Sequence, residues 1–277
     1  MRTLGLPSGA QIPVLGQGTW RMGEDSRREQ DEIAALHLGF DLGMTLVDTA
    51  EMYGEGRTET LVGKAIAGRR DKVFLVSKVY PHNATAAGAV AACERSLKRL
   101  RTDFLDLYLL HWRGDVPFAE TLAGFTKLIE AGKIRHHGVS NLDRDEAQAW
   151  WSLAGGSAVA TDQVLYNLAE RGIEWDLLSW CRQHRVPVMA YTPLGGAGML
   201  KHAALATIGR RHGLTPAQVA LAWVLHRDGV TTIPKAARAE HVRENRAALD
   251  VRLTPDDLGD LDRAFPPPGG PSGLAIR

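Results

Sequence analysis

The chain has 277 residues and a formal net charge of +1, with 44% hydrophobic and 23% charged residues. This balance is ordinary for a globular protein, and the absence of any long block of like charge predicts neither a nucleic-acid nor a membrane partner. The two cysteines, Cys93 and Cys181, each fall in an expected helix, which argues for a reducing compartment and against a disulfide framework. With no signal-peptide pattern and no apolar run long enough to span a membrane, we expect a cytoplasmic protein.

Predicted strands and helices alternate along the whole chain. Residues 1–13 hold Leu-Pro-Ser-Gly-Ala between two short extended pieces, which predicts a β-hairpin. Apolar runs then predict strands over residues 14–19, 45–48, 73–78, 104–111, 134–139, 160–164, 186–190 and 230–233. Periodic apolar positions predict helices over residues 29–43, 57–67, 86–100, 118–131, 143–151, 172–184, 203–211, 216–227, 240–249 and 255–264.

The spacing of these elements indicates the fold class. Strands recur at intervals of roughly thirty residues, the size of one strand with its crossover helix. About eight such units predict a closed (β/α)₈ TIM barrel rather than an open doubly wound sheet. No Pro/Ser-rich linker divides the chain, so we expect residues 1–277 to form a single domain. The N-terminal hairpin and two extra helices, one before the eighth unit and one after it, are additions to this barrel.

Polar or aromatic residues follow the apolar core of every predicted strand. Barrel enzymes keep their active sites at the carboxyl ends of the strands. A strand must end at something polar, so chance explains several of these residues, but a carboxylate, an ammonium, an imidazole and a phenol together predict a site. In chain order the residues are Gly18-Thr19-Trp20, Asp48, Lys78, His111, Ser140-Asn141, Gln163, Tyr191 and Lys235, with Tyr53 on the loop after Asp48.

Asp48, Tyr53, Lys78 and His111 suit proton donation to a carbonyl oxygen. The Lys78 ammonium is expected to lower the pKa of Tyr53 from about 10, while Asp48 holds Lys78 and keeps it charged. His111 can hydrogen-bond a carbonyl oxygen and orient it. Neither a nucleophile–base pair nor clustered metal ligands are present, so we expect no metal. No side chain supplies a hydride, and a cofactor is therefore implied.

With these motifs in place, the chain resembles an aldo-keto reductase from end to end, with one family motif per strand. Among the matching pieces are Val47-Asp48-Thr49-Ala50-x-x-Tyr53-Gly54, Gly138-Val139-Ser140-Asn141 and Ile233-Pro234-Lys235. The resemblance implies a catalytic tetrad of Asp48, Tyr53, Lys78 and His111 and a nicotinamide cofactor lying across the barrel mouth. By the same match, Ser140, Asn141 and Gln163 hold its carboxamide and Tyr191 stacks on its ring.

The remaining cofactor contacts are also implied by the resemblance. Gly16-x-Gly18-x-x-Arg21 lacks the third glycine of the dinucleotide fingerprint. Phosphate binding is instead expected at the loop 194–199, for which a simple flexible turn is the alternative, and at the segment from Lys235. The expected cofactor-binding residues are Gly18, Thr19, Trp20, Asp48, Ser140, Asn141, Gln163, Tyr191, Thr192, Pro193, Leu194, Gly195, Gly196, Ile233, Pro234, Lys235, Ala236, Arg238, His241, Glu244 and Asn245.

The cations Lys235 and Arg238 favour NADPH over NADH, because they can engage a 2′-phosphate. Two departures from the family pattern bear on this preference, since members often have a hydroxyl residue at Ala236 and an arginine at His241. The alternative is that these residues only form the solvated, charged start of a helix.

The substrate pocket is expected above Tyr53 and His111, walled by Trp20, Tyr80 and Trp112, for which rim packing is the alternative role. Short loops predict an open site for small carbonyl compounds, and within its family the chain resembles bacterial methylglyoxal reductases. We therefore expect a monomeric reductase of methylglyoxal and of short or aromatic aldehydes. Two alternatives remain: a diketogluconate-type sugar ketone reductase, in which Arg113 attracts a carboxylate, and a cofactor-binding regulatory barrel with little turnover.

Overall fold

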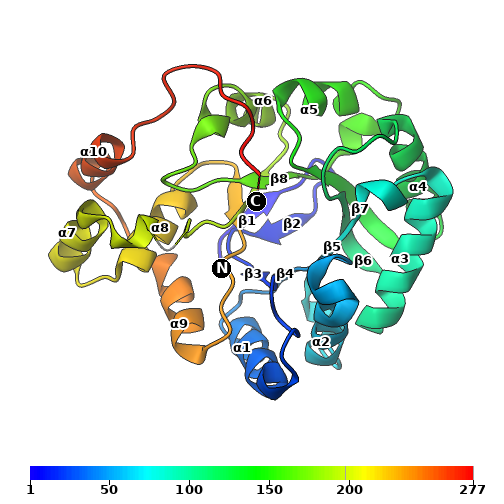
Figure 1. The fold of residues 1–277 in the computed structure, drawn as a ribbon, viewed down its shortest axis with the longest axis horizontal. Helices are drawn as coiled ribbons and strands as arrows, with labels where there is room; N and C mark the ends of the chain where they lie inside the picture. The colour runs from blue at the N-terminus through cyan, green and yellow to red at the C-terminus, as the bar shows by residue number, and fades with distance from the viewer. Residues whose placement is uncertain (197, 277) are drawn as a thin grey trace.

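The computed structural model describes residues 1–196 and 198–276. Eight parallel strands form one sheet that curls into a barrel (Figure 1). The sheet closes where Leu15 bridges Thr232 and Gly18 bridges Lys235, and the Gly16 N–H donates to the Thr232 carbonyl at 2.8 Å. The predicted (β/α)₈ barrel is therefore confirmed. In sheet order the strands are β3 (Gln17–Gly18), β4 (Leu46–Asp48), β5 (Phe74–Val79), β6 (Leu105–Leu110), β7 (Ile134–Ser140), β8 (Asp162–Leu165), β9 (Val188–Tyr191) and β10 (Val230–Thr232).

The predicted hairpin closes one end of the barrel. Strands β1 (Thr3–Gly5) and β2 (Gln11–Pro13) pair antiparallel and cross the middle of the molecule (Figure 1). Leu6 and Ile12 are buried in one cluster with side chains of the barrel interior, among them Leu46, Val76 and Leu107. Because segments near both ends of the chain take part in closing the barrel, we propose that it forms one domain.

Ten α-helices surround the sheet in the described part of the chain. Several begin at capping residues that the sequence supplies: Asp143 and Thr254 each form a capping box with the residue three positions on. The helices are α1 (Glu29–Asp41), α2 (Arg57–Ala65), α3 (Ala86–Leu100), α4 (Phe118–Glu130), α5 (Arg144–Trp151), α6 (Leu177–Gln183), α7 (Ala203–His212), α8 (Pro216–Leu225), α9 (Ala239–Ala248) and α10 (Pro255–Ala264). None of these helices has the length and apolar character needed to cross a bilayer.

The helix predicted over residues 172–184 is in fact two elements. Gly172–Glu174 forms a single 3₁₀ turn, and α6 begins only at Leu177. The backbone of Asp176 is not helical, and its side chain accepts the Leu177 N–H. A residue in this conformation interrupts the helical hydrogen-bond ladder, which divides the segment.

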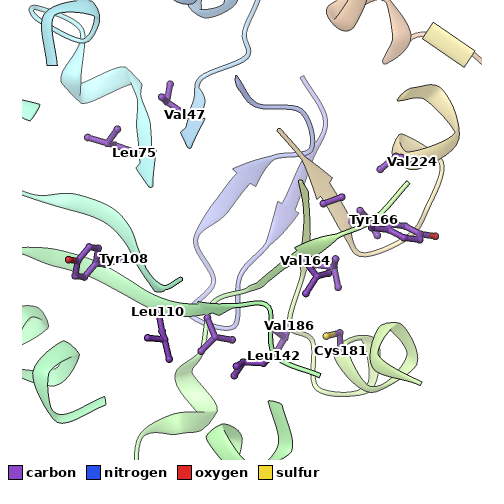
Figure 2. Packing of buried hydrophobic residues seen from close by; sticks show 14 of the residues in the cluster. Val47, Leu75, Tyr108, Leu110, Leu142, Val164, Tyr166, Cys181, Val186 and Val224 are labelled. Carbon is purple, nitrogen blue, oxygen red and sulfur yellow. The ribbon is translucent and has the colours of Figure 1, made fainter. Parts of the chain in front are cut away.

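Side chains alternate between two apolar environments along the strands. Leu46 and Val76 face the barrel interior, whereas Val47, Leu75 and Tyr108 face the surrounding helices (Figure 2). Successive residues of a strand point to opposite faces of a sheet. Both faces are buried here, which is why the strands read as continuous apolar runs in the sequence.

Asp162 on β8 carries a buried carboxyl group that the barrel does not pair. Both of its side-chain oxygens lack a hydrogen-bond partner among the described residues. Burial raises the pKa of Asp162 well above its ordinary value, and the nearby Leu142 N–H offsets this only in part. A folded-state pKa above the unfolded one contributes stability at low pH that is lost as the pH rises.

We therefore predict that Asp162→Asn stabilises the protein in a pH-dependent way. The free energy of unfolding should rise by about 1 kcal/mol or more at neutral pH, because asparagine cannot ionise. The gain should vanish below about pH 4, where the aspartate is protonated in both states. Urea unfolding across this pH range measures the effect, and a gain of equal size at every pH would contradict it.

Candidate active site

Strand alternation directs three ionisable side chains into the barrel mouth. Asp48 lies two residues after Leu46, Lys78 two after Val76 and His111 two after Leu109, and these three apolar residues face the barrel interior. A period of two gives each polar residue the direction of its apolar predecessor. All three are buried at the carboxyl ends of neighbouring strands.

The loop after β4 returns Tyr53 to this cluster. Tyr53 begins a short 3₁₀ turn, Tyr53–Gly56, in which Gly54 and Gly56 have positive φ angles of 54° and 86°. A Cβ atom on Gly56 would also lie 2.7 Å from Cδ of Arg99. Glycine is thus required at Gly56 by both its backbone conformation and its close contact.

Lys78 joins Asp48 to Tyr53. Its Nζ atom lies 2.8 Å from each carboxylate oxygen of Asp48, 2.9 Å from the Thr49 carbonyl oxygen and 3.2 Å from Oη of Tyr53. Burial lowers the pKa of Lys78, while Asp48 acts in the opposite direction by charge and hydrogen bond. Gln163 also donates from Nε2 to Asp48 at 2.7 Å, so the carboxylate is held on two sides.

The expected lowering of the Tyr53 pKa was wrong. Burial first, and then the negative charge of Asp48, raise the pKa of Tyr53 well above its ordinary value. Burial penalises the charged phenolate and the Asp48 carboxylate repels it, so both effects favour the neutral phenol. Tyr53 is consequently a neutral phenol at neutral pH, with its proton available for donation.

His111 is a neutral imidazole beside this phenol. Its ring centroid lies 5.9 Å from that of Tyr53, edge to face, and burial followed by the charge of Lys78 lowers its pKa well below 6.5. Its Nδ1 atom has no hydrogen-bond partner in the part of the chain that the structure describes. A neutral imidazole keeps one N–H, which can donate to a carbonyl oxygen.

Four further predicted residues form one hydrogen-bonded group beside the tetrad. Ser140 donates to the backbone oxygen of Gln163 at 2.7 Å, and Asn141 donates from Nδ2 to the backbone oxygen of His111 at 3.1 Å. The Tyr191 hydroxyl donates to Oδ1 of Asn141 at 2.9 Å. Asn141 has a φ of 58°, a conformation that asparagine tolerates better than most residues.

These groups surround a cavity of about 300 Å³. Met52 also lines the cavity, although it was not among the expected site residues. The one feature of the sequence that points to Met52 is its position directly before Tyr53. The cavity is lined by Gly18, Thr19, Trp20, Asp48, Met52, Tyr53, His111, Ser140, Asn141, Gln163, Tyr191, Thr192, Pro193, Leu194, Gly195, Ile233, Pro234 and Lys235.

Two of the three expected wall residues are not part of this lining. The Trp112 ring stands 4.8 Å from the His111 ring, and Tyr80 packs edge to face on Trp112 at 5.8 Å, but neither is among the residues that line the cavity. Trp20 is at the cavity and is 48% exposed, with the Arg21 guanidinium 4.6 Å above its ring.

The last group of expected cofactor-binding residues lies beyond β10, in the segment before α9 and along that helix. Arg238 is exposed and donates from Nη2 to Nε2 of His241 at 2.7 Å, while Ala236 is buried. Asn245 is buried beside Glu244, and its Nδ2 has no partner among the described residues. An unsatisfied buried amide donor fits a ligand with ring-nitrogen acceptors.

The structure describes only part of the loop that was expected to bind phosphate. Leu194 and Gly195 line the cavity, and Gly196 follows them, but Ala197 of the expected loop 194–199 lies outside the described residues. Among the described residues, no group of three histidine, cysteine or acidic side chains is placed to hold a metal ion.

Comparison with known proteins identifies the family. The aldo/keto reductase family model matches residues 14–265, and the chain belongs to this family. It is 54% identical to methylglyoxal reductase YeaE of Escherichia coli K12, over 95% of this chain and 94% of that protein. It is 30% identical to methylglyoxal reductase DkgB of Salmonella typhimurium, over 93% and 97%. An aldo/keto reductase of Klebsiella pneumoniae, solved with NADP and acetate, is 51% identical, with a TM-score of 0.97 over 99% of both chains.

The buried Asp48–Lys78 pair generates a stability prediction. Lys78→Met should lower the free energy of unfolding by about 3–5 kcal/mol, because it leaves a buried carboxylate without its counter-charge. Adding Asp48→Asn should restore part of the loss, so the two effects should not add. Urea unfolding of both single variants and the double variant measures this coupling.

A matched control is Lys64→Met, which removes a lysine paired with Glu29 at 2.7 Å, with both side chains 37% exposed. This change should cost no more than about 1 kcal/mol. Strictly additive losses for Asp48 and Lys78 would show that the two charges are not coupled.

Proposed function

We propose that this protein is an NADPH-dependent carbonyl reductase that converts small aldehydes and dicarbonyl compounds such as methylglyoxal to alcohols. The observation that carries the proposal is the 3.2 Å contact between Nζ of Lys78 and Oη of Tyr53 in the wall of the cavity. The E. coli methylglyoxal reductase at 54% identity and the NADP-bound Klebsiella enzyme support the substrate and the cofactor. Oxidation of NADPH on addition of methylglyoxal is the direct test.

The residues of the cavity fit a nicotinamide cofactor. Ser140, Asn141 and Gln163 present side-chain amides and a hydroxyl that can hold a carboxamide, and the Tyr191 ring is proposed to stack on the nicotinamide. Lys235 and Arg238 are exposed cations suited to the 2′-phosphate. When bound, reduced nicotinamide supplies the hydride for the carbonyl carbon.

Tyr53 is proposed to give its proton to the carbonyl oxygen as negative charge develops there. The Lys78 ammonium then stabilises the resulting phenolate, and Asp48 keeps Lys78 protonated against the effect of burial. His111 donates its remaining N–H to the same oxygen and fixes the orientation of the carbonyl group.

The substrate side of the cavity is proposed to favour small carbonyl compounds. Trp20 and Met52 line it, and Tyr80 and Trp112 are proposed to contact the substrate beyond His111. Neither a diketogluconate reductase nor a regulatory barrel is favoured, because the relative at 54% identity is a methylglyoxal reductase.

We further propose a cytoplasmic monomer that does not bind nucleic acid. The net charge of +1 and the buried free thiols of Cys93 and Cys181 support this proposal. Size-exclusion chromatography with light scattering tests the monomer, and a stable dimer would contradict it.

Replacing Tyr53 by phenylalanine tests the proton donor. Tyr53→Phe should lower kcat for methylglyoxal by about 10²–10⁴-fold, because the acid is removed while the ring remains. NADPH binding, followed by quenching of tryptophan fluorescence, should persist. Near-normal turnover in this variant would refute the assignment.

Replacing Lys235 and Arg238 together by alanine tests the cofactor preference. Each lost charge-assisted contact should weaken NADPH binding by about 1.5–3 kcal/mol and leave NADH almost unaffected, since only NADPH carries the extra phosphate. Arg243→Ala, an exposed change on α9, the helix that follows Arg238, is the control. Equal losses for both cofactors would remove the 2′-phosphate role.

A further inference from the structure

A second cavity lies at the same end of the barrel as the catalytic one. Asn141 and Gln163 line the catalytic cavity, while Asp143 and Leu165, two positions further along the same segments, line the second, which holds about 270 Å³. Its other wall is the C-terminal tail, including Ser272 and residues 273–275, which returns from α10 toward β8 (Figure 1).

The second cavity is acidic. Asp143, Asp145, Glu170 and Asp176 line it, and the one cation in its lining, Arg144, is paired with Asp145 at 2.7 Å. Asp143 and Asp176 each accept backbone N–H groups at the start of a helix. The Glu170 carboxylate has no hydrogen bond or ion pair to any described residue. The net charge facing this space is negative.

Arg113 is the cation expected to attract a substrate carboxylate in the diketogluconate alternative. In the structure it already forms an ion pair with Glu146. Its Nη1 atom lies 3.2 Å from Oε1 of Glu146, and its guanidinium rests on the Phe118 ring at 5.0 Å. Glu146 cannot easily turn away, because its Oε2 accepts the Asp143 N–H in the capping box of α5. Glu146 therefore neutralises the positive charge of Arg113.

We propose that the acidic rim of the barrel mouth, formed by Asp143, Glu170 and Asp176 with the neighbouring Glu146, selects against carbonyl substrates with a carboxylate remote from the carbonyl group, and that Glu146 sets the selectivity by pairing with Arg113. The inference rests on the proposed function and names the charge class of its substrates. The negative charge on this side of the barrel mouth repels a remote carboxylate, and the two arginines there, Arg113 and Arg144, are already paired with acidic residues. The transition state of such a substrate is therefore disfavoured relative to that of a neutral one.

The test compares benzaldehyde with 4-carboxybenzaldehyde, which differ only in the remote carboxylate. Glu146→Gln should raise the kcat/KM ratio of 4-carboxybenzaldehyde to benzaldehyde about two- to fivefold, the range expected for a solvent-exposed charge contact. The change should appear mainly in KM for the anionic aldehyde and shrink as ionic strength rises. Glutamine retains the capping-box hydrogen bond, so α5 should keep its start.

Three further variants separate the rim from other causes. Glu170→Gln should raise the same ratio by a similar factor, since it removes a second acidic charge of the rim. Arg113→Gln added to Glu146→Gln should return the ratio toward the wild-type value. Asp250→Asn changes the net charge equally at the end of α9, on the opposite face of the barrel, and should leave the ratio unchanged.

An unchanged ratio in both Glu146→Gln and Glu170→Gln overturns the inference, and continued benzaldehyde turnover then leaves the proposed function standing. An equal gain in Asp250→Asn also overturns it, because net charge alone would explain the result. If the wild-type protein reduces neither benzaldehyde nor methylglyoxal, the proposed function fails and this inference fails with it.

Discussion

The site depends on one lysine ammonium held out of water. Lys78 is fully buried, and a charge in that position persists only with a counter-charge and hydrogen-bond acceptors close by. Asp48 and the Thr49 carbonyl supply these, which leaves the third contact of Nζ for Tyr53. Burial and then the negative charge of Asp48 raise the pKa of Tyr53, which is why the phenol stays protonated beside the lysine.

Barrel closure makes this arrangement possible. Asp48 and Lys78 are thirty residues apart and Gln163 is a further 85 residues away, yet hydrogen bonds join all three. Parallel strands with an interior of Leu46, Val76 and their neighbours aim every second side chain at the same axis. The N-terminal hairpin seals the opposite end, so polar groups are concentrated at the one open face.

Positive and negative side chains lie on different sides of the open face of the barrel. Lys235 and Arg238 lie on the side where α9 begins, which suits the phosphates of a cofactor. The side formed by the starts of α5 and α6 carries carboxylates, several of which also cap these helices. One set of acidic residues therefore stabilises helix starts and at the same time gives this side of the barrel mouth its negative potential.

The amino-acid sequence by itself determined the order of elements, the bounds of helices such as α3 and α10, and the polar residues at each strand end, because periodicity and capping are local signals. It also carried the family motifs. Only the tertiary structure decided the raised pKa of Tyr53, the cavity position of Met52, the packing of Trp112 on His111 and the pairing of Arg113 with Glu146. These properties follow from burial and from contacts between segments distant in the chain, and no local pattern encodes either of them.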